Sequence, residues 1–373
     1  MHPKKHSKPR KAQIQMQFNW VFVAIIGAII IIFFMSIVQK QKASSDITLS
    51  HGILSQIDAV ATGAGVSIGT SNELEMPNMD FIFQCDSGSC SGYGCPSTYS
   101  VENFPGVSNS YETDTIFSPS KISGNNLITW SQDFSIPFRV TNFLYLTGDQ
   151  MKYYIVHSGP DTPAKSLNAS LPKHMNKEIV KASDVSTLLN KNNYKVRFIY
   201  INGGTPTVPT ELEDMPDEDV TALTIASSGT DNVWDVTFYK KSTSSFISSD
   251  PYGLSHALTN ASLFGAIFSD SRDIYECNMK KAFARARLVS SVYHNRTEEL
   301  SLSPYLTTRC RDLAILVYPL FEGISIELDT SFTYEGDFDT DPQKTTITNT
   351  GSAMENIKEA NYQALIRSCP VFY

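Results

Sequence analysis

The hydrophobic pattern of this chain is dominated by one apolar stretch near its N-terminus. Residues 18–38 carry no ionisable side chain, and fourteen of them are Ile, Val or Phe. As a helix this stretch would be about 30 Å long, which matches the hydrocarbon core of a bilayer. A helix in a soluble core is usually shorter and keeps a polar face. The pattern therefore predicts a single transmembrane helix at residues 18–38, in contact with membrane lipid.

The charges that flank this stretch indicate its orientation. Lys40 and Lys42 follow it, whereas residues 1–11 contain no acid and a larger group of cations, Lys4, Lys5, Lys8, Arg10 and Lys11. The positive-inside rule then predicts that residues 1–17 form a cytoplasmic tail and that the C-terminal bulk lies outside the cell membrane. A cleaved secretory signal is disfavoured, because its apolar region would be only roughly 7–15 residues long.

Beyond the span, the pattern predicts a stalk and one exterior domain. Apolar residues recur at near-helical spacing after residue 46, and a Gly- and Ser-containing segment follows, so residues 39–77 are interpreted as stalk helix and linker. Residues 78–373 are expected to form an α+β or α/β domain, a mixed sheet with flanking helices stabilised by disulfides. Within it, residues 140–245 alternate strand and helix patterns and predict an α/β part. Residues 265–373 are richer in helical patterns.

Several local elements can be predicted from the same periodicities. Strands at residues 138–148 and 151–159 are separated by two residues, which favours a hairpin. A strand-like run at residues 324–336 is expected to follow a helix that Pro319 and Gly323 end. The remaining helical patterns lie at residues 164–171, 184–193, 273–293, 309–323 and 355–369.

Composition and charge indicate a folded, acidic exterior. Hydrophobic residues make up 41% of the chain, with 21 Phe and 17 Tyr, which is typical of a core-forming protein. The formal net charge is -8, and since residues 1–11 contribute +5, the rest of the chain carries -13. An acidic surface of this kind disfavours nucleic acid and anionic lipid headgroups as partners.

The six cysteines are expected to form disulfides, because export places them in an oxidising compartment. They are Cys85, Cys90, Cys95, Cys277, Cys310 and Cys369. Three lie before residue 100 and three after residue 270, so full oxidation requires at least one bridge between the two ends of the domain. A bridge between Cys277 and Cys310 is the first pairing expected. The first three cysteines could instead bind a metal, but no second pair or histidine follows at the spacing that zinc sites favour.

Other candidate chemistry is sparse. Three sequons, at Asn168, Asn260 and Asn295, predict glycosylation. Asp337, Asp339 and Asp341 alternate as in a calcium loop, but the glycine and glutamate that an EF-hand loop requires are absent, so a solvated loop is favoured.

Catalytic signatures are not recognisable in the sequence. Ser255 and His256 follow Gly253 but lack the second glycine of a nucleophile elbow, and a turn is the preferred interpretation. The cations at residues 280–287 are interpreted as the solvated face of a helix. No cofactor is predicted.

Two resemblances concern the N-terminus. Lys11-Ala12-Gln13-Ile14 resembles the site that prepilin peptidases cut, and QMQFNWVFVAIIGAII resembles the opening of uncharacterised archaeal single-pass membrane proteins. The first resemblance implies a type IV pilin-like subunit cleaved after Ala12, although Gln17 stands where type IV pilins commonly carry Glu.

The sequence thus predicts a membrane-anchored cell-surface protein of structural or interaction type, with a possible protein partner at the surface. The alternatives are the pilin-like subunit and an anchored enzyme whose site is assembled from residues distant in sequence.

Overall fold

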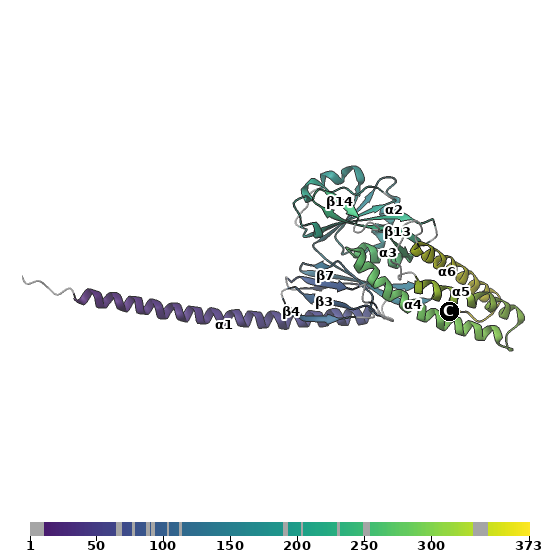
Figure 1. Ribbon diagram of the computed structural model, residues 1–373, viewed down its shortest axis with the longest axis horizontal. Helices are drawn as coiled ribbons and strands as arrows, with labels where there is room; N and C mark the ends of the chain where they lie inside the picture. The colour runs from purple at the N-terminus through teal and green to yellow at the C-terminus, as the bar shows by residue number, and fades with distance from the viewer. Residues whose placement is uncertain are drawn as a thin grey trace, which may run out of the picture. The chain divides into compact units, whose positions relative to one another are not determined.

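The computed structural model describes residues 11–64, 69–76, 79–86, 90, 94–102, 104–111, 114–188, 193–202, 204–229, 232–248, 254–330 and 342–373 (Figure 1). The chain divides into two compact units, Met1–Ile53 and Leu54–Tyr373. Calcium-loop candidates Asp337, Asp339 and Asp341 lie outside the described residues.

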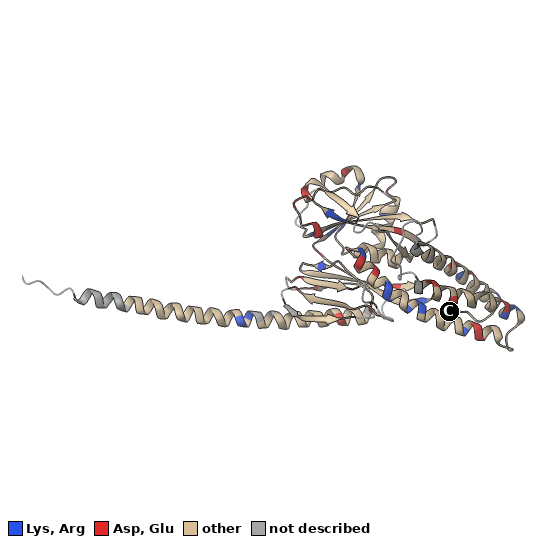
Figure 2. Cartoon of the chain, viewed as in Figure 1, with Lys and Arg blue, Asp and Glu red and all other residues tan. Residues whose placement is uncertain are grey.

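Helix α1 is one continuous element, Lys11–Ala64, of 54 residues and therefore about 80 Å long. Between residues 20 and 38 nearly every side chain is exposed, and Trp20 is 76% exposed. Figure 2 shows this stretch without charged residues. The helix predicted after residue 46 is confirmed, as a direct continuation of the apolar segment. Its last turns belong to the second unit, where Leu54 and Ile57 are buried.

The described part of the second unit contains three sheets. One has the strand order β1-β7-β8-β5, and a second has the order β4-β3-β2-β6. The strands of the first are β1 (Ser71–Glu75), β7 (Asn126–Ser135), β8 (Arg139–Gly148) and β5 (Ile116–Phe117). Those of the second are β4 (Phe104–Ser110), β3 (Ser97–Val101), β2 (Phe81–Cys85) and β6 (Lys121–Ile122). Strand β1 lies within residues that we expected to form a linker.

The third sheet has the order β10-β9-β11-β12-β13-β14, and β15 also pairs with β13. Strands β10, β9, β11 and β12 are parallel, whereas β13, β14 and β15 are antiparallel. The strands are β9 (Met151–His157), β10 (Lys177–Lys181), β11 (Lys195–Ile201), β12 (Val220–Ser227), β13 (Val233–Ser242), β14 (Ser245–Ser248) and β15 (Leu254–Leu258). Its connections contain α2 (Thr162–Ser170) and the 3-10 turns η1 (Ala182–Thr187), η2 (Thr210–Leu212) and η3 (Asp217–Asp219). The helix expected at residues 184–193 is replaced by η1 as far as the chain is described.

The predicted hairpin between β8 and β9 is wrong, because the two strands belong to different sheets. Strand β8 pairs with β7, where Gly148 lies opposite Leu127, and β9 pairs with β10 and β11. A Cβ atom at Gly148 would lie 2.8 Å from the Ser123 carbonyl oxygen. The backbone of Gly148 therefore packs tightly against that of Ser123. After Gly148 the chain crosses to the third sheet, whereas in a hairpin it would turn back beside β8.

In the described residues after the third sheet the chain forms four helices: α3 (Thr259–Phe268), α4 (Arg272–Leu302), α5 (Thr308–Thr330) and α6 (Pro342–Ile366). Helix α5 packs against both α4 and α6, as Figure 1 shows. At the first of these contacts, the Ser290 hydroxyl donates to the Phe321 carbonyl oxygen at 2.7 Å. The helices predicted at residues 164–171, 273–293 and 355–369 are confirmed in type, with boundaries that differ by several residues.

The predicted stop at Pro319 and Gly323 is wrong, and so is the strand expected from residue 324, since α5 continues to Thr330. The buried positions of α5 recur at helical spacing on both sides of the proline, and they include Val317, Phe321 and Leu328. Packing of this stripe outweighs the local cost of the proline. Residues 331–336 of the expected strand lie outside the described chain.

The main core lies between the first sheet, one face of the third sheet, and helices α3 to α6. A smaller core covers the other face of the third sheet. The structure is thus a mixed α+β fold with flanking helices, and it contains a stretch of parallel sheet.

Candidate functional site

The disulfides connect elements that are distant in the sequence. Cys85 pairs with Cys277, Cys90 with Cys95, and Cys310 with Cys369. The predicted link between the two ends of the domain is confirmed by Cys85–Cys277, which ties β2 to α4. The expected Cys277–Cys310 bridge is wrong. Because α4 and α5 are antiparallel, Cys310 lies beside the end of α4, and Cys277 is about 35 Å away along that helix.

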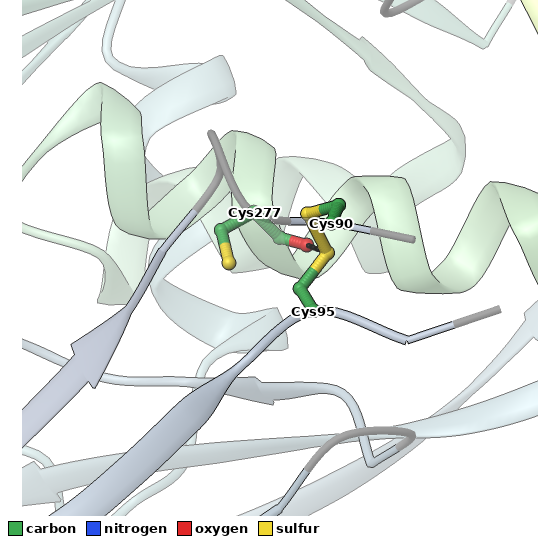
Figure 3. A group of neighbouring side chains, drawn as sticks. All are labelled: Cys90, Cys95 and Cys277. Carbon is green, nitrogen blue, oxygen red and sulfur yellow. Dashed lines mark hydrogen bonds between the residues drawn. A yellow bond between two sulfur atoms is a disulfide. The ribbon is translucent and has the colours of Figure 1, made fainter. Parts of the chain in front are cut away.

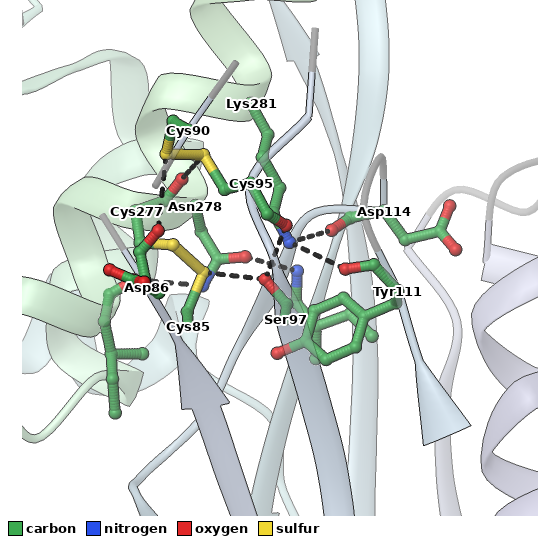
Figure 4. Close-up of a disulfide and its surroundings, with 12 residues drawn as sticks. Cys85, Asp86, Cys90, Cys95, Ser97, Tyr111, Asp114, Cys277, Asn278 and Lys281 are labelled. Atoms are coloured by element: carbon green, nitrogen blue, oxygen red, sulfur yellow. Dashed lines mark hydrogen bonds between the residues drawn. A yellow bond between two sulfur atoms is a disulfide. The ribbon is translucent and has the colours of Figure 1, made fainter. Parts of the chain in front are cut away.

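Two of the bridges lie together on α4 (Figures 3 and 4). The sulfur atoms of Cys90, Cys95 and Cys277 lie within 4.8 Å of one another, and Cys95 Sγ is 3.5 Å from the carbonyl oxygen of Cys277. Metals bind the thiolate form of cysteine, and these sulfurs are all engaged in disulfides. The Cys85–Cys277 bridge fixes α4 to β2, and in the oxidised state the three sulfur atoms are not thiolate ligands.

The next turns of α4 hold the segment that leads into β5, as Figure 4 shows. Asn278 Oδ1 accepts a hydrogen bond from the Ile116 backbone nitrogen at 3.2 Å. The buried Lys281 ammonium donates to the carbonyl oxygens of Tyr111 and Asp114, at 3.3 and 3.2 Å. It also lies 4.2 Å from the centre of the Tyr111 ring. Burial raises the pKa of the Tyr111 hydroxyl well above its ordinary value, so the ring stays neutral beneath the cation.

A pocket of about 450 Å³ opens one turn further along α4. Its lining residues are Ala61, Asp114, Thr115, Ile116, Arg139, Val140, Thr141, Asn142, Leu144 and Arg285. They come from the end of α1, the segment before β5, the start of β8, and α4. Inside the pocket wall, Arg139 Nη2 donates to Asn142 Oδ1 at 3.1 Å. This is the polar pocket that we consider the candidate binding site.

The positions of two cations of α4 differ from the solvated helix face that we expected. Lys281 is only 2% exposed, so it is not part of a solvated face. Arg285 lines the pocket. No sequence pattern indicates that Arg139 and Asp114 lie near them, because these residues are far apart in the chain and neither belongs to a motif.

Ser255 and His256 do not converge. The turn that we expected at these residues is wrong, because both lie on strand β15, where neighbouring side chains point to opposite faces. The Ser255 hydroxyl donates to Glu276 Oε1 at 3.0 Å, and Arg272 Nε donates to the same oxygen at 2.7 Å. His256 Nδ1 lies 2.9 Å from Asp235 Oδ1. The two side chains thus have separate partners.

The other candidate residues are dispersed. Asn260 and Asn295 are exposed, and Asn168 is half-buried on α2, so glycosylation stays a prediction. Ala12 and Gln13 lie in the first turn of α1.

A buried ion pair, absent from the sequence-based predictions, joins β11 to the start of α4. Lys195 Nζ lies 2.6 Å from Asp270 Oδ2, and the side chains are 1% and 5% exposed. The backbone nitrogen and hydroxyl of Ser120 donate to the same oxygen at 2.9 and 2.6 Å. Burial alone would raise the pKa of Asp270, but the Lys195 ammonium and the Ser120 donors hold this pKa below its ordinary value.

Arg197 extends this buried cluster. Its guanidinium donates to the Thr221 hydroxyl and to the Ala266 carbonyl oxygen, both at 2.9 Å. Burial lowers the pKa of Arg197 to about 10, so the group is still charged near neutral pH. Because the whole cluster is enclosed, we interpret it as a structural tie between the third sheet and α3–α4.

Comparison of this chain with protein-family models, curated proteins and solved structures finds no match.

Proposed function

We propose that the chain is a single-pass membrane protein whose short basic N-terminus is cytoplasmic and whose large C-terminal domain lies outside the cell. The observation that carries this proposal is the exposed apolar stretch of α1. Between residues 20 and 38, thirteen side chains of this stretch are Ile, Val or Phe. At roughly 1.5–3 kcal/mol for each side chain left in water, their exposure would cost on the order of 20–40 kcal/mol. A bilayer removes this cost.

The disulfides support an exterior location for the second unit. All six cysteines are paired, and such bridges persist mainly in oxidising compartments. The bridges also stabilise the folded domain, because they restrict its unfolded state.

The role that we propose for the exterior domain is binding at the cell surface. Its support is the polar pocket beside α4, whose volume of about 450 Å³ is within the range of ligand sites in proteins. Strand β2 is disulfide-linked to α4, and the segment that leads into β5 is hydrogen-bonded to α4 beside this pocket; a preformed site of this kind is typical of binding proteins.

Protease accessibility on intact cells tests the orientation. The full chain would carry one epitope tag at each terminus, and protease would be added outside. We expect the C-terminal tag to be lost and the N-terminal tag to remain on a membrane-bound fragment. Protection of the C-terminal tag until detergent is added would contradict the proposal.

A pilin-like subunit is the second candidate function, and the continuity of α1 favours it. A helix of about 80 Å is more than twice as long as a bilayer span requires, and it leaves a long rod that could pack against equivalent helices in a filament. N-terminal sequencing of the protein from its membrane separates the two. A chain that begins at Gln13 supports the pilin-like subunit, and retention of residues 1–12 supports the simple anchor.

A further inference from the structure

The pocket lies beside the part of β8 that does not pair with β5. Strand β5 pairs with β8 only at Leu144 and Tyr145, and the Leu144 nitrogen donates to the Thr115 carbonyl oxygen at 3.0 Å. In the described chain, residues 139–143 of β8 therefore pair with β7 on one side and have no strand on the other. The pocket occupies this open edge.

The floor and the rim of the pocket differ in chemistry. Ile116 and Leu144 are buried and supply an apolar floor, and Asn142 is a buried polar group beside them. The rim residues Asp114, Arg139 and Arg285 are exposed. A ligand with an apolar body and a charged end would contact both surfaces.

The rim carries an excess of positive charge. Of the residues that line the pocket in the described structure, two are arginines and one is an acid. The side-chain oxygen of Asn142 accepts from the Arg139 guanidinium and holds it at the pocket wall. Arg285 lies one helical turn after Lys281, and no described carboxylate forms an ion pair with it. Figure 4 shows the Asp114 side chain pointing away from Lys281, whose ammonium donates to the backbone carbonyl oxygen of Asp114.

We propose that this pocket binds a small organic anion, with its carboxylate or phosphate group between Arg139 and Arg285 and its body over Ile116 and Leu144. The planar guanidinium group matches the oxygens of carboxylates and phosphates through paired hydrogen bonds. Asp114 repels the anion and sets a limit to its affinity. This inference rests on the proposed binding role of the pocket and names its ligand class, and it holds on either side of the membrane.

Calorimetric titration of the purified full chain in detergent tests the proposal. The probes are succinate for the carboxylate, glycerol phosphate for the phosphate, and glycerol as the neutral control. We expect one of the two anions to bind with a stoichiometry of one and glycerol not to bind. The anion that binds tells which oxyanion the pocket prefers.

Substitutions locate the binding. Arg139→Gln and Arg285→Gln should each raise the dissociation constant roughly tenfold or more, since each removes a charged donor. Arg309→Gln, at an exposed arginine of α5 outside the pocket, is the matched control and should change nothing. Asp114→Asn should lower the dissociation constant, a gain that misfolding cannot imitate.

Two results would overturn the inference. One is the absence of binding by both anions at millimolar concentration in the unmodified chain and in Asp114→Asn. The other is binding that persists unchanged in both pocket arginine variants. Neither result bears on the membrane orientation, which the protease experiment tests separately.

Discussion

The ion pair between Lys195 and Asp270 allows a quantitative test of the fold. Asp270→Asn keeps the size and shape of the side chain and removes only its charge. The Lys195 ammonium, with 1% of its side chain exposed, would then lack its counter-charge in the core. Breaking a buried pair in this way costs about 3–5 kcal/mol of unfolding free energy. Removing both charges, with Lys195→Met added, should recover most of that loss because no unpaired ion is left.

The pH dependence follows from the lowered pKa of Asp270. The pKa of the Asp270 carboxyl is lower in the folded state than in the unfolded state, where it is about 3.9. The carboxyl therefore stabilises the folded protein at pH values above about 3.9, and this contribution is lost as the pH falls through its pKa in the folded state. The unmodified chain should therefore lose stability below about pH 4. Asp270→Asn should lack this part of the acid response.

Urea unfolding of the full chain with intact disulfides provides the measurement. Trp130, buried in the second unit, gives a fluorescence signal for that unit. Asp161→Asn is the matched control, because Asp161 forms an exposed ion pair with Lys165 on α2, and it should change stability little. If Asp270→Asn is no more destabilising than this control, the reasoning about the buried pair is refuted.

Three further predictions concern packing, covalent links and modification. Gly265→Ala should cost about 1–3 kcal/mol, because the new Cβ would lie 2.8 Å from Phe117 Cε1, whereas Gly323→Ala, with nothing within 4 Å, should be neutral or stabilising in the same urea assay. Replacing both Cys310 and Cys369 by Ser should lower the free energy of unfolding by about 4 kcal/mol, since their bridge closes a loop with a sequence separation of 59. In the unmodified protein, peptide mapping without reduction should find no Cys277–Cys310 link. In a glycosylating host, Asn260→Gln and Asn295→Gln should each remove one glycan mass from the protein, and an unchanged intact mass would contradict the sequon assignment.

Local sequence patterns were sufficient to predict an element where a single physical effect, such as hydrophobicity or helix propensity, determines it. The apolar stretch of α1 is recognisable because its length and lack of charge match a bilayer. Helix α4 is recognisable because strong helix formers follow the acid Asp273, although the hydrogen-bonding cap is Ser271, whose hydroxyl accepts from the Ile274 nitrogen.

Topology could not be predicted from those patterns. Strands β8 and β9 are adjacent in sequence and equally apolar, and only their contacts with other strands place them in different sheets. Helix α5 passes through Pro319 because of the residues that it buries, which a local rule does not include.

The binding pocket was equally hidden. Asp114, Arg139 and Arg285 come from three elements that are brought together by sheet pairing and by the Cys85–Cys277 bridge. Lys195 and Arg197 lie on β11, yet the acid that neutralises Lys195 lies 75 positions away. Sequence spacing carries no information about such pairs.

The link between Cys85 and Cys277 also determines when the domain can be completed. Its partners are separated by 192 positions, so at typical synthesis rates the second thiol emerges roughly 10–40 s after the first. During that interval Cys85 has only Cys90 and Cys95 as nearby oxidation partners, and any such pairing has to be exchanged later. Closure of the Cys85–Cys277 bridge therefore waits until about three quarters of the 373 residues have been synthesised.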